Sequence, residues 1–292
     1  MAFAVDPDRP LGRALRSVGK ALAAAARDDL LLVGEDPVAA VHDARREIRS
    51  ARAVVKLVRV SVGPKEYARQ NGALRRAGRQ LSSHRDAHVL GSAFNRLLGH
   101  DPSLEDEHTP RLRALLTAVD EGSGQALQIA AAAALAEVDA FDEGVAKWPR
   151  KGRVVEINVA TGFEQTLRRV RRATEFAADE PTADALHTLR KRAKDAREQF
   201  RTLMPLASKR YGKLERRYTA LCSLLGEGCD QVVLARACER LDTLHPELAQ
   251  TIERVRESAL ARFERVGTAA LAEARTLTER SPRKIAGRLL ER

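Results

Sequence analysis

The sequence is poor in aromatic residues and in residues that interrupt helices. Aromatic side chains make up 4% of the 292 residues, and the chain holds only 18 glycines and 11 prolines. Alanine, leucine, arginine and glutamate, which are strong helix formers, dominate the remainder. This composition predicts helices packed on helices, in one large domain or in two of ordinary size.

Cysteine is also scarce, and its arrangement excludes two kinds of stabilised small domain. The three cysteines, Cys222, Cys229 and Cys238, are odd in number and form no Cys-x-x-Cys motif. They therefore predict neither a disulfide framework nor a zinc knuckle, and they are typical of a reducing compartment.

Long apolar runs are missing from the sequence as well. The most apolar stretch, residues 129–136, is too short to span a bilayer. Residues 1–13 lack the apolar segment of a signal peptide. We therefore expect a soluble protein of the cytoplasm.

Acidic residues are outnumbered by basic ones. The chain carries 51 lysines and arginines against 40 aspartates and glutamates, a formal net charge of +11. Such an excess of positive charge gives information about binding partners rather than about the fold. It favours a nucleic acid, an anionic membrane or another polyanion as the partner. On charge alone, an inert basic surface remains the alternative.

Apolar residues recur at helical spacing through most of the sequence, so the predicted fold class is all-α. Breaks at 34–37, 63–64 and 179–182 separate the periodic segments, and 148–153 is the best candidate for a linker. Residues 154–159 alternate like a short strand, but no other segment offers a partner strand. Helices are predicted over 10–30, 38–61, 64–83, 86–99, 109–120, 123–148, 160–178, 182–204, 208–225, 229–243 and 246–279.

An internal repeat with an offset of about 145 residues divides the chain near residue 150. Its members are 41–52 with 186–197, 81–90 with 225–234, Tyr67 and Arg69 with Tyr211 and Lys213, and, more faintly, 15–20 with 167–172. We therefore predict a single domain, 1–292, made of two related helical halves, 10–150 and 151–292.

A row of basic residues lies on one face of the helix that begins near His42. At about 100° per residue, this face holds the first basic row: His42, Arg45, Arg49, Arg52, Lys56 and Arg59. The same positions in the second half hold the second basic row: His187, Arg190, Lys194, Arg197 and Arg201. The adjoining faces are apolar and would supply the contact with the core.

Each basic row destabilises its own helix, because like charges at these spacings repel one another. An extended anion would supply the missing counter-charge: arginine donates in a fork to phosphate oxygens, lysine adds a point charge, and histidine adds a donor near neutral pH. Aromatic residues for base stacking are scarce, which favours a phosphate polymer over a single-stranded nucleic acid. Contacts to a duplex backbone, a solvated basic face and a pair of core histidines are the alternatives.

These motifs resemble the CHAD family, the conserved-histidine α-helical domain. The family pattern is a histidine followed by basic residues at +3, +7, +8 and +10, once in each half. The first copy reads His42, Arg45, Arg49 and Arg52, with Ser50 at +8. The second copy reads His187, Arg190, Lys194 and Arg197, with Asp195 at +8 and Lys191 at +4. A Leu-Gly-x-x-x-Asp signature follows as Leu225, Gly226 and Asp230, and in the first half as Leu81, Ser82 and Asp86, without its glycine.

The resemblance covers residues from about 10 to 280 and implies two four-helix-type bundles related by a pseudo-twofold, with a basic central groove between them. It further implies that the groove binds inorganic polyphosphate and that the protein is targeted to polyphosphate granules. Family members often follow a CYTH triphosphatase domain, whose Glu-x-Glu-x-Lys motif is absent here. The implied function is a binding module without a hydrolase of its own, and no cofactor is expected.

Further basic residues extend the predicted polyphosphate-binding set beyond the two rows. Arg168 and Arg172 share a helix face and would lengthen the groove, with a solvated basic helix as the alternative. The remaining predicted contacts are Lys191 and the repeat-related residues Arg16, Lys20, Arg69 and Lys213.

Catalytic motifs are not recognisable in the sequence. It contains no Ser-His-Asp order, P-loop or Gly-rich phosphate loop, so no enzyme is expected. His84 and His88 have metal-ligand spacing but no evident third ligand, and Asp86 and Asp230 are better interpreted as helix caps or as partners of a basic side chain. A nucleic-acid-binding or general polyanion-binding helical protein is the alternative function, and the oligomeric state stays open.

Overall fold

The computed structural model describes residues 3–81, 86–118 and 123–291, and the regular elements in these ranges are all helical. The long helices are α1 (Leu11–Leu31), α2 (Pro37–Gln80), α5 (Ser123–Val145), α6 (Arg153–Asp179), α7 (Ala183–Leu203), α8 (Ser208–Leu244) and α9 (Ala249–Thr278). Shorter ones are α3 (Asp86–His100), α4 (Thr109–Thr117) and α10 (Pro282–Gly287). Within these ranges, no helix is both long enough and apolar enough to cross a membrane. The predicted all-α class is confirmed.

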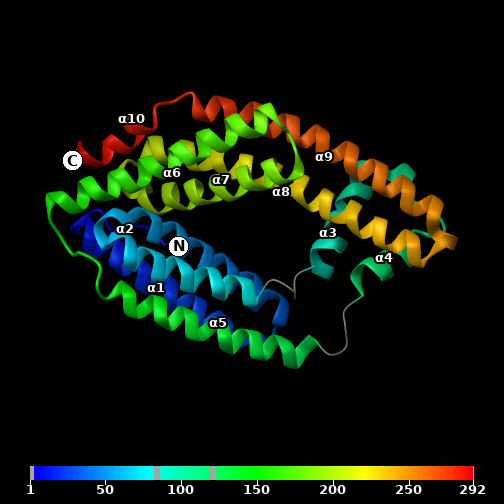
Figure 1. Cartoon of the computed structure of the whole chain (residues 1–292), viewed down its shortest axis with the longest axis horizontal. Coiled ribbons are helices and arrows are strands. Elements are labelled where there is room, and N and C mark those ends of the chain that lie inside the picture. The colour runs from blue at the N-terminus through cyan, green and yellow to red at the C-terminus, as the bar shows by residue number, and fades with distance from the viewer. Residues whose placement is uncertain (1–2, 82–85, 119–122, 292) are drawn as a thin grey trace.

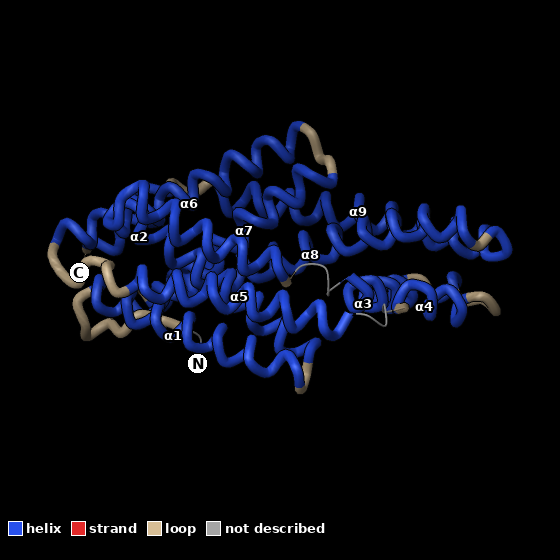
Figure 2. The backbone as a smooth tube through the Cα atoms, turned by 60° about the horizontal axis from the view of Figure 1, so that its bottom comes forward, coloured by secondary structure: helices blue, strands red, loops and turns tan. Residues whose placement is uncertain are grey.

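The helices form two groups that share one core. Helices α1, α2 and α5 pack together, and α6, α7, α8 and α9 form a second group beside them (Figure 1). The larger hydrophobic core runs through both groups, from Leu57 on α2 to Phe163 on α6 and Phe200 on α7. A smaller core, with Phe94 and Leu234, joins α3 and α4 to the far ends of α8 and α9. This part extends from one end of the molecule (Figure 2).

The two helices that carry the basic rows begin with side-chain caps. Asp36 accepts a hydrogen bond from the backbone N–H of Ala39 at the start of α2, and Pro37 occupies the first turn. Thr182 accepts from the N–H of Ala185 at the start of α7. Such caps satisfy backbone donors that a helix leaves unpaired. They fix where each helix starts, and so which residues share the face of each row.

Helix α2 consists of two antiparallel arms. Gly63, with a φ of 79° that favours glycine, and Pro64 interrupt the helical geometry at the predicted break. The chain then reverses, so that the second arm lies against the first. Arg45 Nη1 donates to the carbonyl oxygen of Gly78 (3.0 Å), and Arg52 Nε donates to Asn71 Oδ1 (3.4 Å). In the second half, α7 and α8 are separate helices joined by the turn η4 (Met204–Leu206).

The structure corrects two predicted boundaries. Residues 154–159 are not a strand but the first turns of α6, with Val155 and Val159 buried and Val154 exposed. The predicted helices 208–225 and 229–243 are one continuous helix, α8. Its glycines serve close packing instead of a break: a Cβ on Gly228 would lie 3.2 Å from Val266 on α9.

Helices α2 and α6 cross closely at Gly162. A Cβ there would lie 2.8 Å from the carbonyl oxygen of Lys56 and would also press on the carbonyl oxygen of Leu57. Neither backbone atom can move away without shifting α2 as a whole. The absence of a side chain at this position therefore sets the distance between the two helix groups.

Replacing Gly162 with alanine tests this crossing. We expect the free energy of unfolding of Gly162→Ala to fall by about 1–3 kcal/mol, the usual cost of overpacking, in urea denaturation followed by circular dichroism. Gly99→Ala on α3 is the matched control, because a Cβ there meets no atom within 4 Å. Unchanged stability of Gly162→Ala would show that the helices do not approach as described.

Candidate functional site

The two basic rows lie on helices that pack against each other. Three contacts fix the register of α2 and α7: Ser50 Oγ donates to Glu198 Oε2 (3.2 Å), Gln199 Nε2 donates to the carbonyl oxygen of Ala53 (2.9 Å), and Lys56 Nζ lies 2.5 Å from Asp195 Oδ1. The positive charge of Arg49 acts on Lys194 and lowers its pKa. The middle of the first basic row is therefore close enough to the middle of the second for their charges to interact.

The first basic row lies against the second arm of α2. Arg45 and Arg52 are half-buried and reach Gly78 and Asn71 on that arm. Burial lowers the pKa of Arg52, against the opposing effect of Asp195. His42 is exposed at the head of the row. Each of these arginines therefore donates to an amide oxygen of the second arm, which holds it against that arm.

The second basic row lies in the same way against α8. Arg190 Nη1 is 3.9 Å from Asp230 Oδ1, and its guanidinium passes over Gly226, where a Cβ would lie 3.4 Å from Nη2. The glycine of the Leu-Gly signature thus makes room for this arginine. Farther along the row, Arg197 pairs with Glu198 and Arg201 Nη2 is 3.0 Å from Glu215. Charge compensation is therefore strongest toward the C-terminal end of α7.

Lys194 lies at the centre of the second basic row. Its side chain is half-buried and has no hydrogen-bond or ion-pair partner among the described residues. Burial, followed by the positive charges of Arg49 and Arg190, lowers the pKa of Lys194 to about 7. Arg197 acts in the same direction, and the thiol of Cys222 opposes it. The amine thus occupies a strongly electropositive position.

Lys56 differs from the other members of its row. It is 6% exposed, and its ammonium is paired with Asp195. Asp195 occupies the +8 position of the second copy, and Ser50, the +8 residue of the first copy, bonds to Glu198. Both departures from the family pattern therefore lie in the contact between α2 and α7. Lys56, a predicted ligand contact, forms an intramolecular ion pair in this structure.

Several other predicted residues lie outside the crossing of the rows. Lys20 pairs with Asp142 (2.8 Å), Arg69 with Glu66 (2.6 Å) and Arg168 with Glu164 (2.6 Å). Arg168 and Arg172 line a cavity of about 320 Å³ with Arg171, Arg283, Glu164, Glu175, Ser281 and Pro282, none of which comes from α2, α7 or α8. Lys191 and Lys213 are exposed and Arg16 is half-buried. Arg168 and Arg172 thus line a cavity of their own.

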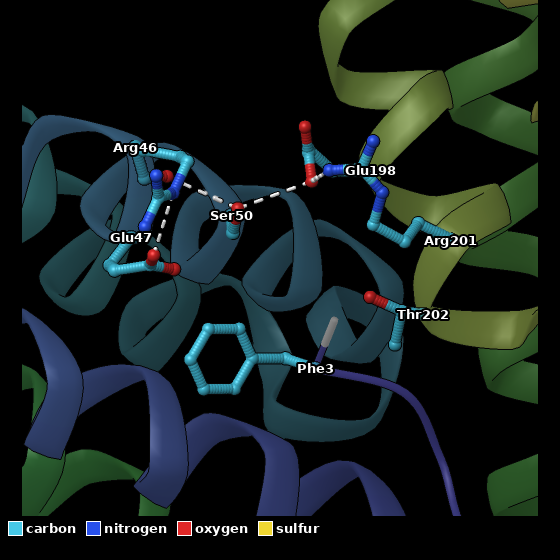
Figure 3. Close-up of a pocket in the computed structure, with 7 residues that line it drawn as sticks. All are labelled: Phe3, Arg46, Glu47, Ser50, Glu198, Arg201 and Thr202. Carbon is cyan, nitrogen blue, oxygen red and sulfur yellow. Dashed lines mark hydrogen bonds and ion pairs between the residues drawn. The ribbon is translucent and has the colours of Figure 1, made fainter. Parts of the chain in front are cut away.

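Another cavity at the same crossing is lined by acidic residues that no sequence motif indicated. Glu47 and Glu198, both 4% exposed, line about 240 Å³ together with Phe3, Arg46, Ser50, Arg201 and Thr202. Figure 3 shows Ser50 between the Arg46 and Glu198 side chains. Burial raises the pKa of Glu47, while its bond to Arg46 acts the other way. No member of the first basic row lines this cavity, whereas Arg46 of α2 and Arg201 of the second basic row do.

His187 heads the second basic row beside a cysteine. Its Nδ1 lies 3.8 Å from Cys229 Sγ, and a cavity of about 250 Å³ opens there. Burial, then the charges of Lys191 and Arg190, lower the pKa of His187. Asp230 accepts a hydrogen bond from Arg96 (2.8 Å) and lies near Arg190, which agrees with its predicted role as partner of a basic side chain. No sequence motif indicated Arg96 as part of this cluster.

The metal-ligand spacing of His84 and His88 cannot be placed in the structure. Residue 84 and the side chains of residues 86 and 88 lie outside the described part of the chain. In the part that is described, no group of three or more histidine, cysteine, aspartate or glutamate side chains is arranged to hold a metal ion.

Comparison with known proteins identifies a family and a similar solved structure. Residues 13–239 match the CHAD domain model. The crystal structure of the CHAD domain from the plant Ricinus communis superimposes with a TM-score of 0.67 at 20% identity, covering 96% of each chain, and at that identity it supports the fold alone. A search of curated proteins found no match. With most of its length matched by the family model, and with the paired histidine and basic rows in place on α2 and α7, this chain belongs to the CHAD family.

Proposed function

We propose that this protein binds inorganic polyphosphate in a basic groove between the two rows, without catalysing a reaction on it. The observation that carries the proposal is Lys194, a half-buried amine near Arg49, Arg190 and Arg197 that has no partner among the described residues. Four basic side chains from two helices converge there, and the described residues offer Lys194 no carboxylate. A bound anion would remove this repulsion, so the site is best explained by an anionic ligand.

The shape of the rows supports an extended ligand. Each row spans roughly 20 Å of helix, and its residues recur every three or four positions. A phosphate polymer carries a negative charge at every unit and can meet successive forked guanidiniums without offering any other chemical group. We propose that the two halves are related by a pseudo-twofold that presents both rows to one chain.

The proposed contacts are a subset of the predicted ones. Lys56 is assigned to holding α2 and α7 together, since its charge is already compensated. The proposed polyphosphate contacts are His42, Arg45, Arg49, Arg52, His187, Arg190, Lys191, Lys194 and Arg197. Binding of this kind would also direct the protein to polyphosphate granules in the cytoplasm.

Aromatic residues near the rows are placed unfavourably for a nucleic acid. Phe200, Tyr211 and Tyr218 are at most 3% exposed, and in the core Phe200 stacks on Tyr218 and makes an edge-to-face contact with Tyr211. Tyr67 lies beneath the guanidinium of Arg59, 5.0 Å from it. These rings are therefore not available to stack on bases, which single-stranded nucleic acid binders require. This favours a polymer without bases.

A titration of long-chain polyphosphate and of single-stranded DNA of equal charge, at physiological salt, tests the proposal. We expect wild type to prefer polyphosphate, and Arg49→Glu with Lys194→Glu to lose roughly 100-fold or more in affinity, because phosphate contacts dominate binding. Arg240→Glu with Arg265→Glu changes the net charge equally on exposed positions of α8 and α9 and should bind within about threefold of wild type.

Each outcome of that titration has a distinct meaning. Equal binding of the two polymers would favour a general polyanion or nucleic acid role. Failure to bind either polymer would contradict the proposal. Circular dichroism of both double variants verifies that the helices are intact.

Polyphosphate affinity should fall as pH rises above neutrality. The pKa of Lys194 is lowered to about 7 in the unliganded protein. A bound polyanion favours the charged amine and raises its pKa, so binding takes up protons at pH values between the unliganded and the liganded pKa. Between pH 6.5 and 8 we expect affinity to fall about five- to tenfold. Lys194→Arg keeps its charge and should reduce this dependence, and an equally steep profile in that variant would contradict the assignment.

A further inference from the structure

The chain that follows α9 is fastened along α6 by arginines of that helix. Arg171 donates from Nε to the carbonyl oxygen of Thr278 (3.1 Å) and from Nη2 to those of Thr278 (2.8 Å) and Arg280 (2.9 Å). Near the other end of α6, Arg153 Nη2 donates to the carbonyl oxygen of Leu290 (3.0 Å). Helix α10 therefore lies beside α6 (Figure 1).

A cavity of about 320 Å³ lies between α6 and the start of α10. This volume is at the lower end of the range of roughly 300–1,000 Å³ that is typical of small-molecule sites. Its lining carries more positive than negative charge, so it favours a small anion. The charged lining residues are Arg168, Arg171, Arg172, Arg283, Glu164 and Glu175.

Two of the lining arginines are available to bind an anion. Arg172 on α6 and Arg283 on α10 are exposed, and neither has a hydrogen-bond or ion-pair partner among the described residues. Ser281 Oγ accepts a hydrogen bond from the backbone N–H of Lys284 (3.4 Å), which leaves its own hydrogen for a ligand. Two guanidiniums and one hydroxyl from two separate elements therefore line the same cavity.

Acidic residues limit how far a ligand can extend along α6. Glu164 and Glu175 share a face of the helix, about 16 Å apart along its axis, and Arg172 lies between them. A long polyphosphate lying along this face would pass a carboxylate at each end of the cavity, and like charges repel. A compact anion that stays between the two glutamates avoids both.

We infer that this cavity binds a compact phosphate anion, with inorganic diphosphate as its simplest form, at a site separate from the basic groove. Diphosphate has enough oxygen atoms to accept from both guanidiniums and from the Ser281 hydroxyl at once. The inference does not rest on the proposed function, because α2, α7 and α8 contribute no residue to this cavity.

A bound anion would also hold the C-terminal residues more firmly. Arg172 and Arg283 carry like charges on opposite walls, so in the empty cavity they oppose the docking of α10. A shared anion attracts both. Helix α10 covers part of the core, since Tyr211 Oη donates to the carbonyl oxygen of Ile285 (3.0 Å). The ligand would therefore favour the closed state over local opening of this segment.

Calorimetric titration of the whole protein with inorganic diphosphate, at physiological salt and without divalent cations, tests the site. We expect saturable binding that weakens at least about tenfold in Arg172→Gln and in Arg283→Gln, because each loses a charged hydrogen bond. Lys284→Gln removes the same charge from an exposed side chain outside the cavity and should bind within about twofold of wild type. Glu175→Gln should bind more tightly, since it removes a repelling carboxylate.

Hydrogen exchange gives a second measurement of the same site. Diphosphate should slow exchange of the backbone amides of residues 283–287 in wild type and leave it unchanged in Arg172→Gln. Circular dichroism verifies that each variant is folded. Absence of saturable binding at millimolar diphosphate, or wild-type affinity in Arg172→Gln with Arg283→Gln, would overturn the inference.

The groove variant separates this inference from the proposed function. Arg49→Glu with Lys194→Glu should bind diphosphate as wild type does, and Arg172→Gln with Arg283→Gln should still bind long-chain polyphosphate. Loss of diphosphate binding in the groove variant would overturn the inference, because the anion would then occupy the groove. Diphosphate binding at the cavity in a protein that does not bind polyphosphate would support the inference and contradict the proposed function.

Discussion

The crossing of α2 and α7 is the constraint on which the rest of the molecule depends. The ion pair of Lys56 with Asp195 lies in a nearly water-free contact, where a lone charge would be costly, so each residue holds the other in place. Gly162 lets α6 approach the same stretch of α2. Together they fix the register that places Arg49 beside Lys194. A shift of one helical turn would separate these two side chains and would open the core that joins the helix groups.

Charge is distributed unevenly around this crossing. Glu47 and Glu198 are buried on the side that Figure 3 shows, where arginines and Ser50 bind their oxygens. In the second basic row, Lys194 has no partner among the described residues, and the charges of Arg49, Arg190 and Arg197 act on it. The cations there repel one another, and this lowers the stability of the unliganded protein. The same repulsion would make an anion bind tightly, so stability and the proposed function oppose each other at one place.

Glycines and valines show where local sequence patterns mislead. Gly63 marks a true reversal, because its φ is positive and a proline follows. Gly226 and Gly228 predict a break in the same way, yet α8 continues through both, since they make room for Arg190 and for α9. Val154 alternates with Glu156 like a strand residue, but it is exposed on a helix whose buried face begins at Val155. Packing with distant segments therefore decides whether a glycine ends a helix and whether an alternating segment forms a strand.

The sequence by itself determined the helical class, the main breaks and which cations share a helix face, because these follow from local propensity and from the 3.6-residue period. Only the tertiary structure decided which of those cations keep an uncompensated charge. Lys56 and Lys194 belong to equivalent rows, yet Lys56 pairs with Asp195 across the crossing, whereas Lys194 lies near the positive charge of Arg49. Packing alone brings together partners so far apart in the chain, so the spacing of residues within one helix cannot predict these contacts.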